Sequence, residues 1–249
     1  MPARSTPMSN PTIDSEERRR FDAAEKIRIH ESPLVRPTLQ PTEACLRAHF
    51  EGPVGREARE LSNPHVEPKV TPEARTKARP ASVLLGVVLR EPEPTVILTQ
   101  RHHGISFPGH WVFPGGRAEQ ADATPIETAI REAEEEIGLD PNAVEVLGRL
   151  GDYVSHSGYR VVPTVALIRP PIDLRPQPGE VETIAEVPLS ALTNPAHYFL
   201  FRFADRQDRA HFALDFPNDP AREGLMLTGV TVSIAIGFYA DLLRGQGLA

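Results

Sequence analysis

The sequence lacks several features that would indicate a secreted or membrane protein. Its 249 residues include a single cysteine, Cys45, so no internal disulfide can form and nothing depends on an oxidising compartment. No uninterrupted apolar run reaches the roughly 18 residues that a membrane-spanning helix needs, and no apolar core follows the basic residues of the N-terminal segment. We therefore expect an intracellular, cytoplasmic protein that does not enter a membrane.

An excess of positive charge is also absent. The chain has 27 Lys+Arg against 34 Asp+Glu and a formal net charge of -7, which gives no general attraction to nucleic acid. We see no internal repeat and no helix-turn-helix pattern, and we expect no DNA partner. A local basic pocket for a phosphorylated small molecule is compatible with the acidic total, and so is a homodimer.

Proline is abundant, with 26 residues, and its uneven distribution indicates the domain boundaries. Residues 1–79 are the loosest part and are predicted to form an N-terminal arm on a domain that spans residues 80–245. Within the arm, residues 1–13 are expected to be disordered, and residues 15–32 and 42–50 to form short helices.

The run Arg18, Arg19 and Arg20 in this arm is either a phosphate or partner patch or the solvated face of a helix.

Apolar, β-branched segments from residue 81 onward predict strands. Residues 81–90 and 95–101 flank the turn signal EPEP and are predicted to form a hairpin. The further strand candidates are residues 111–113, 144–154, 159–168 and 181–189. Helices are predicted at residues 124–137 and 229–244. This mixture favours an α/β or α+β sandwich.

The helix at residues 124–137 has well-marked ends. Thr124 is a good N-cap, Pro125 suits the first helical position, and Glu127 is placed for a capping box with Thr124. Gly138 supplies the C-terminal stop. A buried apolar stripe is predicted at Ile126, Ala129, Ile130, Ala133 and Ile137.

The other face of this helix carries Glu132, Glu135 and Glu136 at spacings i, i+3 and i+4, so the three carboxylates share one arc. We expect Glu135 and Glu136 to lie on the solvent face. Three convergent carboxylates suit Mg²⁺ or Mn²⁺, hard cations that take oxygen ligands. The alternative is an ordinary acidic surface.

The preceding loop favours the metal site. Gly115 and Gly116 allow a tight backbone excursion where a strand ends, and the loop then carries Glu119 and Asp122 towards the helix. Arg131 is placed to form a bidentate link to a loop carboxylate and so to pin the loop to the helix.

These residues resemble the Nudix box, which runs Gly, five residues, Glu, seven residues, Arg-Glu, apolar, any, Glu-Glu, any, Gly, apolar. Residues 131–139 match its second half at every position. Counting from Gly116, the consensus Glu falls on Asp122, and eight residues instead of seven separate it from Arg131. The resemblance implies a Nudix-type α/β/α sandwich with a mixed β-sheet.

The resemblance also implies the roles of the box residues. Glu132, Glu135 and Glu136 would be metal ligands, and Asp122, Arg131 and Gly138 would be structural.

The flanks, over residues 80–245, are most similar to the coenzyme A diphosphatase branch of this family. The resemblance rests on ASVLLGVVLR with VILTQR, SHSGYRVVPTVALI, GEVETIAEVPLSAL and LTGVTVSIAIGFYADLL. That branch typically carries an Arg and a Gly-Gln element after Gln100-Arg101, where this chain has HHGISFPGHW. The implied reaction is hydrolysis of coenzyme A or its derivatives to 3′,5′-ADP and (acyl-)4′-phosphopantetheine.

A general base would deprotonate the attacking water, and the candidates are Glu136, Glu135 and, by resemblance to a Glu outside the box in relatives, Glu180. Glu180 is otherwise an exposed loop acid.

Several other residues are candidates for substrate binding. Besides Gly115 and Gly116, Arg101 and Arg160 would receive phosphate oxygens unless they are surface charges. Tyr159 either packs in the core or stacks on a base. Three loop histidines are either phosphate contacts or incidental, namely His102, His103 and His110.

Two rival functions remain open. One is a Nudix hydrolase with another substrate, such as ADP-ribose, NADH, another dinucleotide cofactor, a sugar nucleotide or capped RNA. The other is a non-catalytic Nudix module that senses a nucleotide and uses the arm to bind a partner.

Overall fold

The computed structural model describes residues 26–30, 34, 36–53, 55, 71–155, 157–203, 206–216 and 219–248. The strands in the described residues are β1 (Lys26–His30), β2 (Arg79–Val88), β3 (Thr95–Arg101), β4 (Trp111–Val112), β5 (Gly115–Arg117), β6 (Val144–Arg149), β7 (Tyr153–Val154), β8 (Tyr159–Ile168), β9 (Val181–Pro188), β10 (Tyr198–Phe203), β11 (Arg206–Asp215) and β12 (Met226–Thr228). The α-helices are α2 (Glu43–Glu51), α3 (Pro72–Lys77), α4 (Pro125–Ile137), α5 (Leu189–Leu192) and α6 (Gly229–Gly245).

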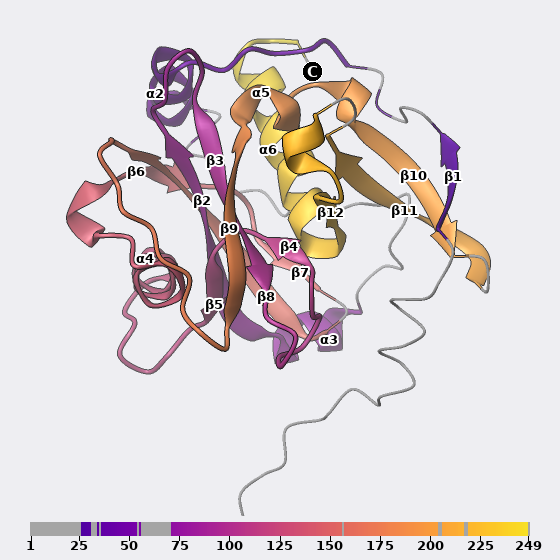
Figure 1. Cartoon of the computed structure of the whole chain (residues 1–249), viewed down its shortest axis with the longest axis horizontal. Coiled ribbons are helices and arrows are strands. Elements are labelled where there is room, and N and C mark those ends of the chain that lie inside the picture. Colours follow the sequence, from indigo (N-terminus) through magenta and orange to yellow (C-terminus); the bar gives the residue numbers. More distant parts are fainter. Residues whose placement is uncertain are drawn as a thin grey trace, which may run out of the picture.

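The strands form one open, mixed sheet with helices packed against it, in agreement with the predicted α+β class. The strand order is β1-β10-β11-β12-β4-β3-β2-β8-β6, and β5, β7 and β9 pair with β2, β8 and β3. Figure 1 shows α4 and α6 on either side of the central strands.

The predicted hairpin of β2 and β3 is confirmed, but the two strands touch at one end only. They pair through Val87 with Val96 and Val88 with Thr95. On its other side, β2 pairs in parallel with β8 along its whole length. Strand β3 pairs with β9 instead. The two strands therefore separate towards the end of the sheet where β5 lies (Figure 1).

Helix α4 begins and ends where the sequence predicts. The Thr124 side chain accepts the backbone N–H of Glu127, and Gly138 ends the helix in the left-handed conformation at φ 66°. The carboxylate of Glu127 reaches back one residue further than a capping box requires and accepts the N–H of Ala123 at 2.7 Å.

The apolar stripe of α4 packs on one face of the sheet. Ala129, Ala133 and Ile137 are buried there against β2 and β8, whereas Ile126 and Ile130 are half-buried. Burial of this stripe fixes the rotation of the helix and so determines where its glutamates point.

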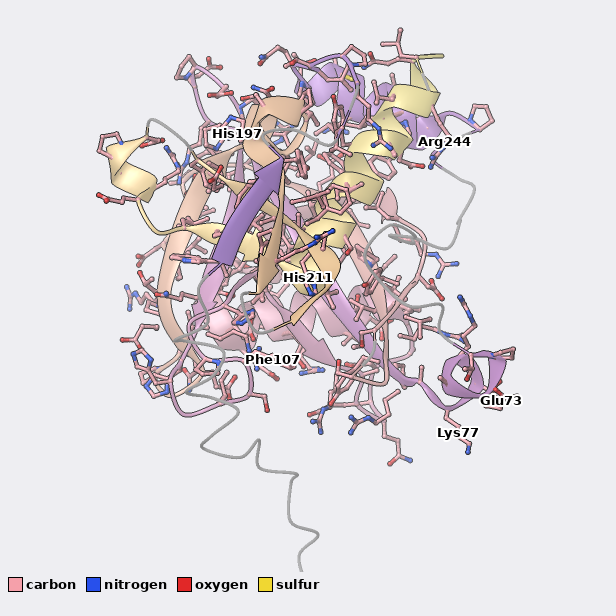
Figure 2. All side chains as sticks on the ribbon, turned by 90° about the vertical axis from the view of Figure 1, so that its right-hand side faces the viewer. Glu73, Lys77, Phe107, His197, His211 and Arg244 are labelled. Atoms are coloured by element: carbon pink, nitrogen blue, oxygen red, sulfur yellow. The ribbon has the colours of Figure 1, made fainter. Side chains whose placement is uncertain are left out.

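The main core lies on the other face and includes residues from the predicted arm. Leu46 and Phe50 of α2 are buried in the same cluster as Phe238 and Leu242 of α6. His49 and Asp241 join the two helices through a buried contact of 2.9 Å, and Figure 2 shows Arg244 of α6 beside α2. The arm thus contributes to the core, and the boundary at residue 79 stays a prediction.

We predict that Leu46→Ala lowers the free energy of unfolding by about 2–5 kcal/mol, because the side chain is fully buried and its removal leaves a cavity. Chemical denaturation measures this loss. A difference below about 0.5 kcal/mol would show that α2 is an appendage rather than part of the core.

The predicted helix at residues 15–32 is wrong where the structure describes it. Residues 26–30 form β1, which pairs with β10, because the alternating KIRIH pattern gains ladder hydrogen bonds from a distant strand. The remainder of that stretch, the predicted disorder at residues 1–13 and the Arg18–Arg20 run lie outside the described residues. Helix α2 is confirmed, and α3, β5 and β10–β12 are additional elements that we did not predict.

In the part of the chain that the structure describes, no helix combines the length and hydropathy needed to span a bilayer.

Candidate active site

The loop before α4 lies against the helix because two glycines permit it. Gly115 has φ 152°, and a Cβ on it would stand 2.3 Å from the carbonyl oxygen of Ser82. A Cβ on Gly116 would stand 2.4 Å from Oε2 of Glu132. The absence of side chains at both positions therefore lets β5 pair with β2 and lets the Glu132 carboxylate approach the loop backbone.

Arg131 connects this loop to the helix. Its guanidinium donates to both carboxylate oxygens of Asp122 at 3.1 and 3.0 Å, and to the carbonyl oxygen of Arg117 at 2.9 Å. It also contacts Glu132 at 3.0 Å and Glu135 at 2.9 Å. Asp122 thus forms the bidentate contact despite its shorter side chain and the extra residue before Arg131.

Asp122 is further fixed by neutral donors. The backbone N–H of Glu119 and the hydroxyl of Thr128 each donate to Oδ2, at 2.9 and 3.0 Å. The hydrogen bonds from Arg131 hold the pKa of Asp122 well below its usual range, so the carboxylate is ionised at neutral pH. We did not predict the role of Thr128, although its position one turn after Thr124 directs it to the loop.

Glu136 is buried, contrary to the expected solvent face, because the loop covers this side of α4. It is 6% exposed, and its Oε2 accepts the N–H of Gly115 at 3.1 Å. Burial raises the pKa of Glu136 to about 7, and the negative charges of Glu132 and Glu180 act in the same direction. Its ionised form therefore needs a cation nearby.

Glu132 and Glu135 differ in their surroundings. Burial raises the pKa of Glu132, and the charges of Glu135 and Glu180 add to this effect, while Arg131 opposes it. The Glu135 side chain is 55% exposed. The three box glutamates thus share one arc of the helix, but only Glu132 and Glu136 turn into the covered region.

Glu180 approaches these acids from the turn that leads into β9. The carbonyl oxygen of Glu180 accepts the N–H of His102 at 2.9 Å, which ties the turn to the end of β3. The Glu180 side chain is exposed, and no described residue donates a hydrogen bond to it. The fold thus brings Glu132, Glu136 and Glu180 within mutual electrostatic range.

Arg101 lies among the same acids. Burial lowers its pKa, and the charges of Glu136, Glu180 and Glu132 oppose that effect. Its Nε donates to the carbonyl oxygen of Ser106 at 2.8 Å. The remaining donors of a half-buried guanidinium at this position suit a phosphate oxygen.

The donor set fits a divalent cation, although the side chains do not form a complete ligand cluster as they stand. Among the described residues, no group of three or more His, Cys, Asp or Glu side chains is close enough to hold a metal ion. Arg131 forms ion pairs with one carboxylate oxygen each of Glu132 and Glu135, and the N–H of Gly115 donates to Oε2 of Glu136. These oxygens are therefore directed at protein donors. Two covered carboxylates with raised pKa values, and an unpartnered third nearby, are the surroundings in which Mg²⁺ or Mn²⁺ would be stabilising.

Tyr159 and Arg160 lie near this end of the sheet but on opposite sides of β8. The ring of Tyr159 is half-buried against the main core, and the guanidinium groups of Arg79 and Arg117 lie over it. Arg160 is exposed and contacts Asp152 at 3.9 Å and the carbonyl oxygen of Arg75. Arg160 is therefore engaged with Asp152 and Arg75, and its role in substrate binding stays a prediction.

Two of the three loop histidines contact an acid of β9. Nε2 of His102 and Nε2 of His103 stand 3.8 and 3.5 Å from Oε2 of Glu182. The N–H of Gly104 donates to Nδ1 of His102 at 3.0 Å. These contacts join the β3–β4 loop to the β9 turn that carries Glu180.

Comparisons with known proteins identify a family model that covers this site. The NUDIX domain model matches residues 80–207. The uncharacterized Nudix hydrolase NudL of Photorhabdus laumondii is 44% identical over 124 residues, which cover 49% of this chain and 66% of that protein. NudL of Escherichia coli K12 is 41% identical over 121 residues, which cover 48% of this chain and 62% of that protein. The match thus spans just under two thirds of each relative.

Among solved structures, a C. elegans Ap4A hydrolase binary complex aligns with a TM-score of 0.39 at 20% identity, covering 44% of this chain and 80% of that one.

Proposed function

The chain belongs to the Nudix family, and from this premise we propose that it is a metal-dependent hydrolase of a nucleoside diphosphate linked to another group. The observation that carries the proposal is the convergence of Glu132, Glu136 and Glu180 beside Arg101. Nudix hydrolases generally use divalent metal ions, and in this chain Mg²⁺ or Mn²⁺ would be held by Glu132, Glu135 and Glu136.

When bound, such an ion supplies neutralisation of the diphosphate charge and acidification of a water molecule. The chain's own residues do the rest. Arg101 binds a non-bridging phosphate oxygen, and the loop held by Arg131 and Asp122 keeps Glu132 and Glu136 in position. A water oxygen attacks one phosphorus, the anhydride P–O bond breaks, and two phosphomonoesters are released.

Glu180 is the proposed general base, with Glu136 and Glu135 as the other candidates. A base needs access to the attacking water and a carboxylate oxygen that no donor holds. Glu180 meets both conditions, whereas Gly115 and Arg131 hold Glu136 and Glu135 by hydrogen bonds.

We expect Glu180→Gln to lower kcat by about 10²- to 10⁴-fold with little change in melting temperature, because the side chain is exposed. Glu134→Gln, at an exposed position of α4, is the matched control and should retain most activity. If both variants have equal kcat values, the assignment of Glu180 is wrong.

The two loop glycines give a second pair of matched variants. The atoms nearest to a Cβ on Gly116 belong to the flexible carboxylate end of Glu132, so Gly116→Ala should leave the melting temperature nearly unchanged but displace this carboxylate and lower kcat at least tenfold. A Cβ on Gly115 meets backbone atoms of Ser82 and Val83, so Gly115→Ala should lower the melting temperature. Equal effects of the two variants on stability would contradict this geometry.

For the substrate we propose coenzyme A or an acyl-coenzyme A, cleaved to 3′,5′-ADP and (acyl-)4′-phosphopantetheine. Support comes from the resemblance of the segments that flank the box to the coenzyme A diphosphatase branch. The segment HHGISFPGHW departs from that branch, and this departure favours a second candidate, a Nudix hydrolase of ADP-ribose, NADH or capped RNA.

A substrate panel distinguishes the two. Purified protein with Mg²⁺ or Mn²⁺ is incubated with coenzyme A, acyl-coenzyme A, NADH, ADP-ribose, diadenosine polyphosphates and capped RNA, and the products are identified by mass. Release of 3′,5′-ADP and 4′-phosphopantetheine is expected. Turnover of another compound alone would assign the second candidate, and absence of all turnover would contradict the enzymatic proposal.

A further inference from the structure

Two arginines from neighbouring strands meet on one tyrosine ring at the end of the sheet. Cζ of Arg79 lies 4.3 Å from the ring centroid of Tyr159, and Cζ of Arg117 lies 5.4 Å from it. Strand register explains the meeting, because Arg79 pairs with Tyr159 across β2 and β8, and Arg117 pairs with Ala81 across β5 and β2. Cation–π contacts use the guanidinium face and leave the N–H edges available.

The positive charge of this pair is not neutralised by an acid in the described part of the chain. Neither guanidinium has a carboxylate oxygen within 4.0 Å there, and neither donates a side-chain hydrogen bond to a described residue. Both residues are exposed. Figure 2 shows Glu73 and Lys77 projecting from α3 away from the body of the protein, so the acid closest to Arg79 along the chain is not directed at it.

Arg160 provides a contrast, because its guanidinium already contacts Asp152 and a backbone carbonyl. Two exposed guanidinium groups that lie over one ring, with no acid within 4.0 Å among the described residues, present donors to which an anion can bind.

The pair adjoins the candidate active site. Arg117 directly follows Gly116, and its carbonyl oxygen accepts from Arg131, the residue that contacts Glu132 and Glu135. Tyr159 interacts electrostatically with Arg101, which lies among the acids. Because the Tyr159 ring packs on the main-core face, opposite α4, a substrate whose diphosphate is bound at the carboxylates would pass the sheet end formed by β5, β2 and β8 to reach Arg79 and Arg117.

We propose that Arg79 and Arg117, held by the ring of Tyr159, form a subsite for a phosphomonoester that the substrate carries in addition to its diphosphate. The inference rests on the proposed function, since it extends the same site. A phosphomonoester is close to dianionic at neutral pH, so it matches two guanidinium charges better than a sugar hydroxyl or a single carboxylate does. The subsite would favour nucleotides with a ribose phosphate over those without it.

The test compares binding of 3′,5′-ADP and 5′-AMP by calorimetry, since the two differ only by the extra phosphate. We expect the wild-type protein to bind 3′,5′-ADP about tenfold or more tightly than 5′-AMP. Arg79→Gln and Arg117→Gln should each reduce this preference several-fold while changing the affinity for 5′-AMP little. Arg149→Gln, at an exposed arginine of β6, is the matched control for loss of one positive charge.

Tyr159→Phe and Tyr159→Leu separate the ring from the hydroxyl. The Phe variant should keep the preference, and the Leu variant should lose part of it. Equal affinity of the wild-type protein for the two nucleotides, binding of neither, or an equal loss for both in the arginine variants would overturn the subsite.

Hydrolysis of coenzyme A and dephospho-coenzyme A is measured on the same preparations. A preference in binding without hydrolysis would retain the subsite and reject the proposed reaction. Hydrolysis of both compounds at equal kcat/KM, unchanged in the arginine variants, would retain the reaction and reject the subsite.

Discussion

Replacing Glu136 with Gln is expected to abolish hydrolysis and, at the same time, to stabilise the metal-free protein at pH 8. The carboxylate is 6% exposed, and its pKa is raised from 4.5 to about 7 chiefly by burial. The folded state therefore binds a proton more tightly than the unfolded state does. The wild-type protein loses the stability that this bound proton gives as the pH rises from about 4.5 to 7. A Gln side chain stays neutral, so the variant does not lose stability over this range.

The expected gain in the free energy of unfolding is on the order of 2 kcal/mol above pH 7, or about 5 °C in melting temperature for a protein of this size. Thermal melts in EDTA at pH 8 and at pH 4.5 measure this gain. The difference in melting temperature between variant and wild type should be small at pH 4.5 and should reach its full size at pH 8. Glu134→Gln, at an exposed position of the same helix, should show no such difference. A lower melting temperature of the Glu136→Gln variant than of the wild type at pH 8 would contradict the account of burial.

The same substitution should remove the response to metal. Mg²⁺ stabilises a folded protein that binds it by mass action, so millimolar Mg²⁺ should raise the melting temperature of the wild-type protein and not that of Glu136→Gln. Activity should fall by at least about 10³-fold, since the variant loses a ligand of the proposed ion. Residual activity near the wild-type level would reject the metal assignment.

Arg131→Ala is expected to have the largest effect on stability among the substitutions at the candidate site. Its removal leaves Asp122, whose side chain is 5% exposed, without its main counter-charge, and it also frees Glu132 and Glu135. Breaking a covered ion pair by removal of one partner typically costs about 3–5 kcal/mol. Activity should fall as well, because the loop no longer fixes Glu132.

Two variants test this role of Arg131. Arg131→Lys keeps the charge but not the planar fork, so its stability should lie between those of the wild type and Arg131→Ala. Arg175→Ala removes an exposed ion pair with Asp173 and should change the free energy of unfolding by less than about 1 kcal/mol. An unchanged denaturation midpoint for Arg131→Ala would show that the loop is held by other contacts.

Local patterns in the sequence were sufficient to predict α4, β3 and β8. The caps Thr124 and Gly138 act within the helix itself, and the apolar runs of the strands are buried on both faces of the sheet. Strands β10–β12 were missed: β10 and β11 pair as a local hairpin that we did not recognise, whereas β12 also pairs with the distant strand β4 through Leu227 and Trp111.

The candidate site required contacts that the spacing of residues does not specify. Helical periodicity places Glu136 on the polar arc of α4, but the loop that covers it is fixed by Asp122 and Arg131. The approach of Glu180 to the helix depends on the β3–β9 pairing, and the resemblance alone indicated it. Arg79 and Arg117 carried no motif, and only the strand register brings them to one ring.

The central claim is that the covered carboxylates of α4 hold the divalent cation on which hydrolysis depends. Titration of the protein with Mn²⁺, with free ion measured by electron paramagnetic resonance and hydrolysis rates taken on the same samples, tests it most directly. The account predicts that bound Mn²⁺ and rate rise together in the wild type, and that Glu132→Gln and Glu136→Gln lose both. Equal Mn²⁺ binding by the wild type and these variants, or full hydrolysis in EDTA, would contradict it.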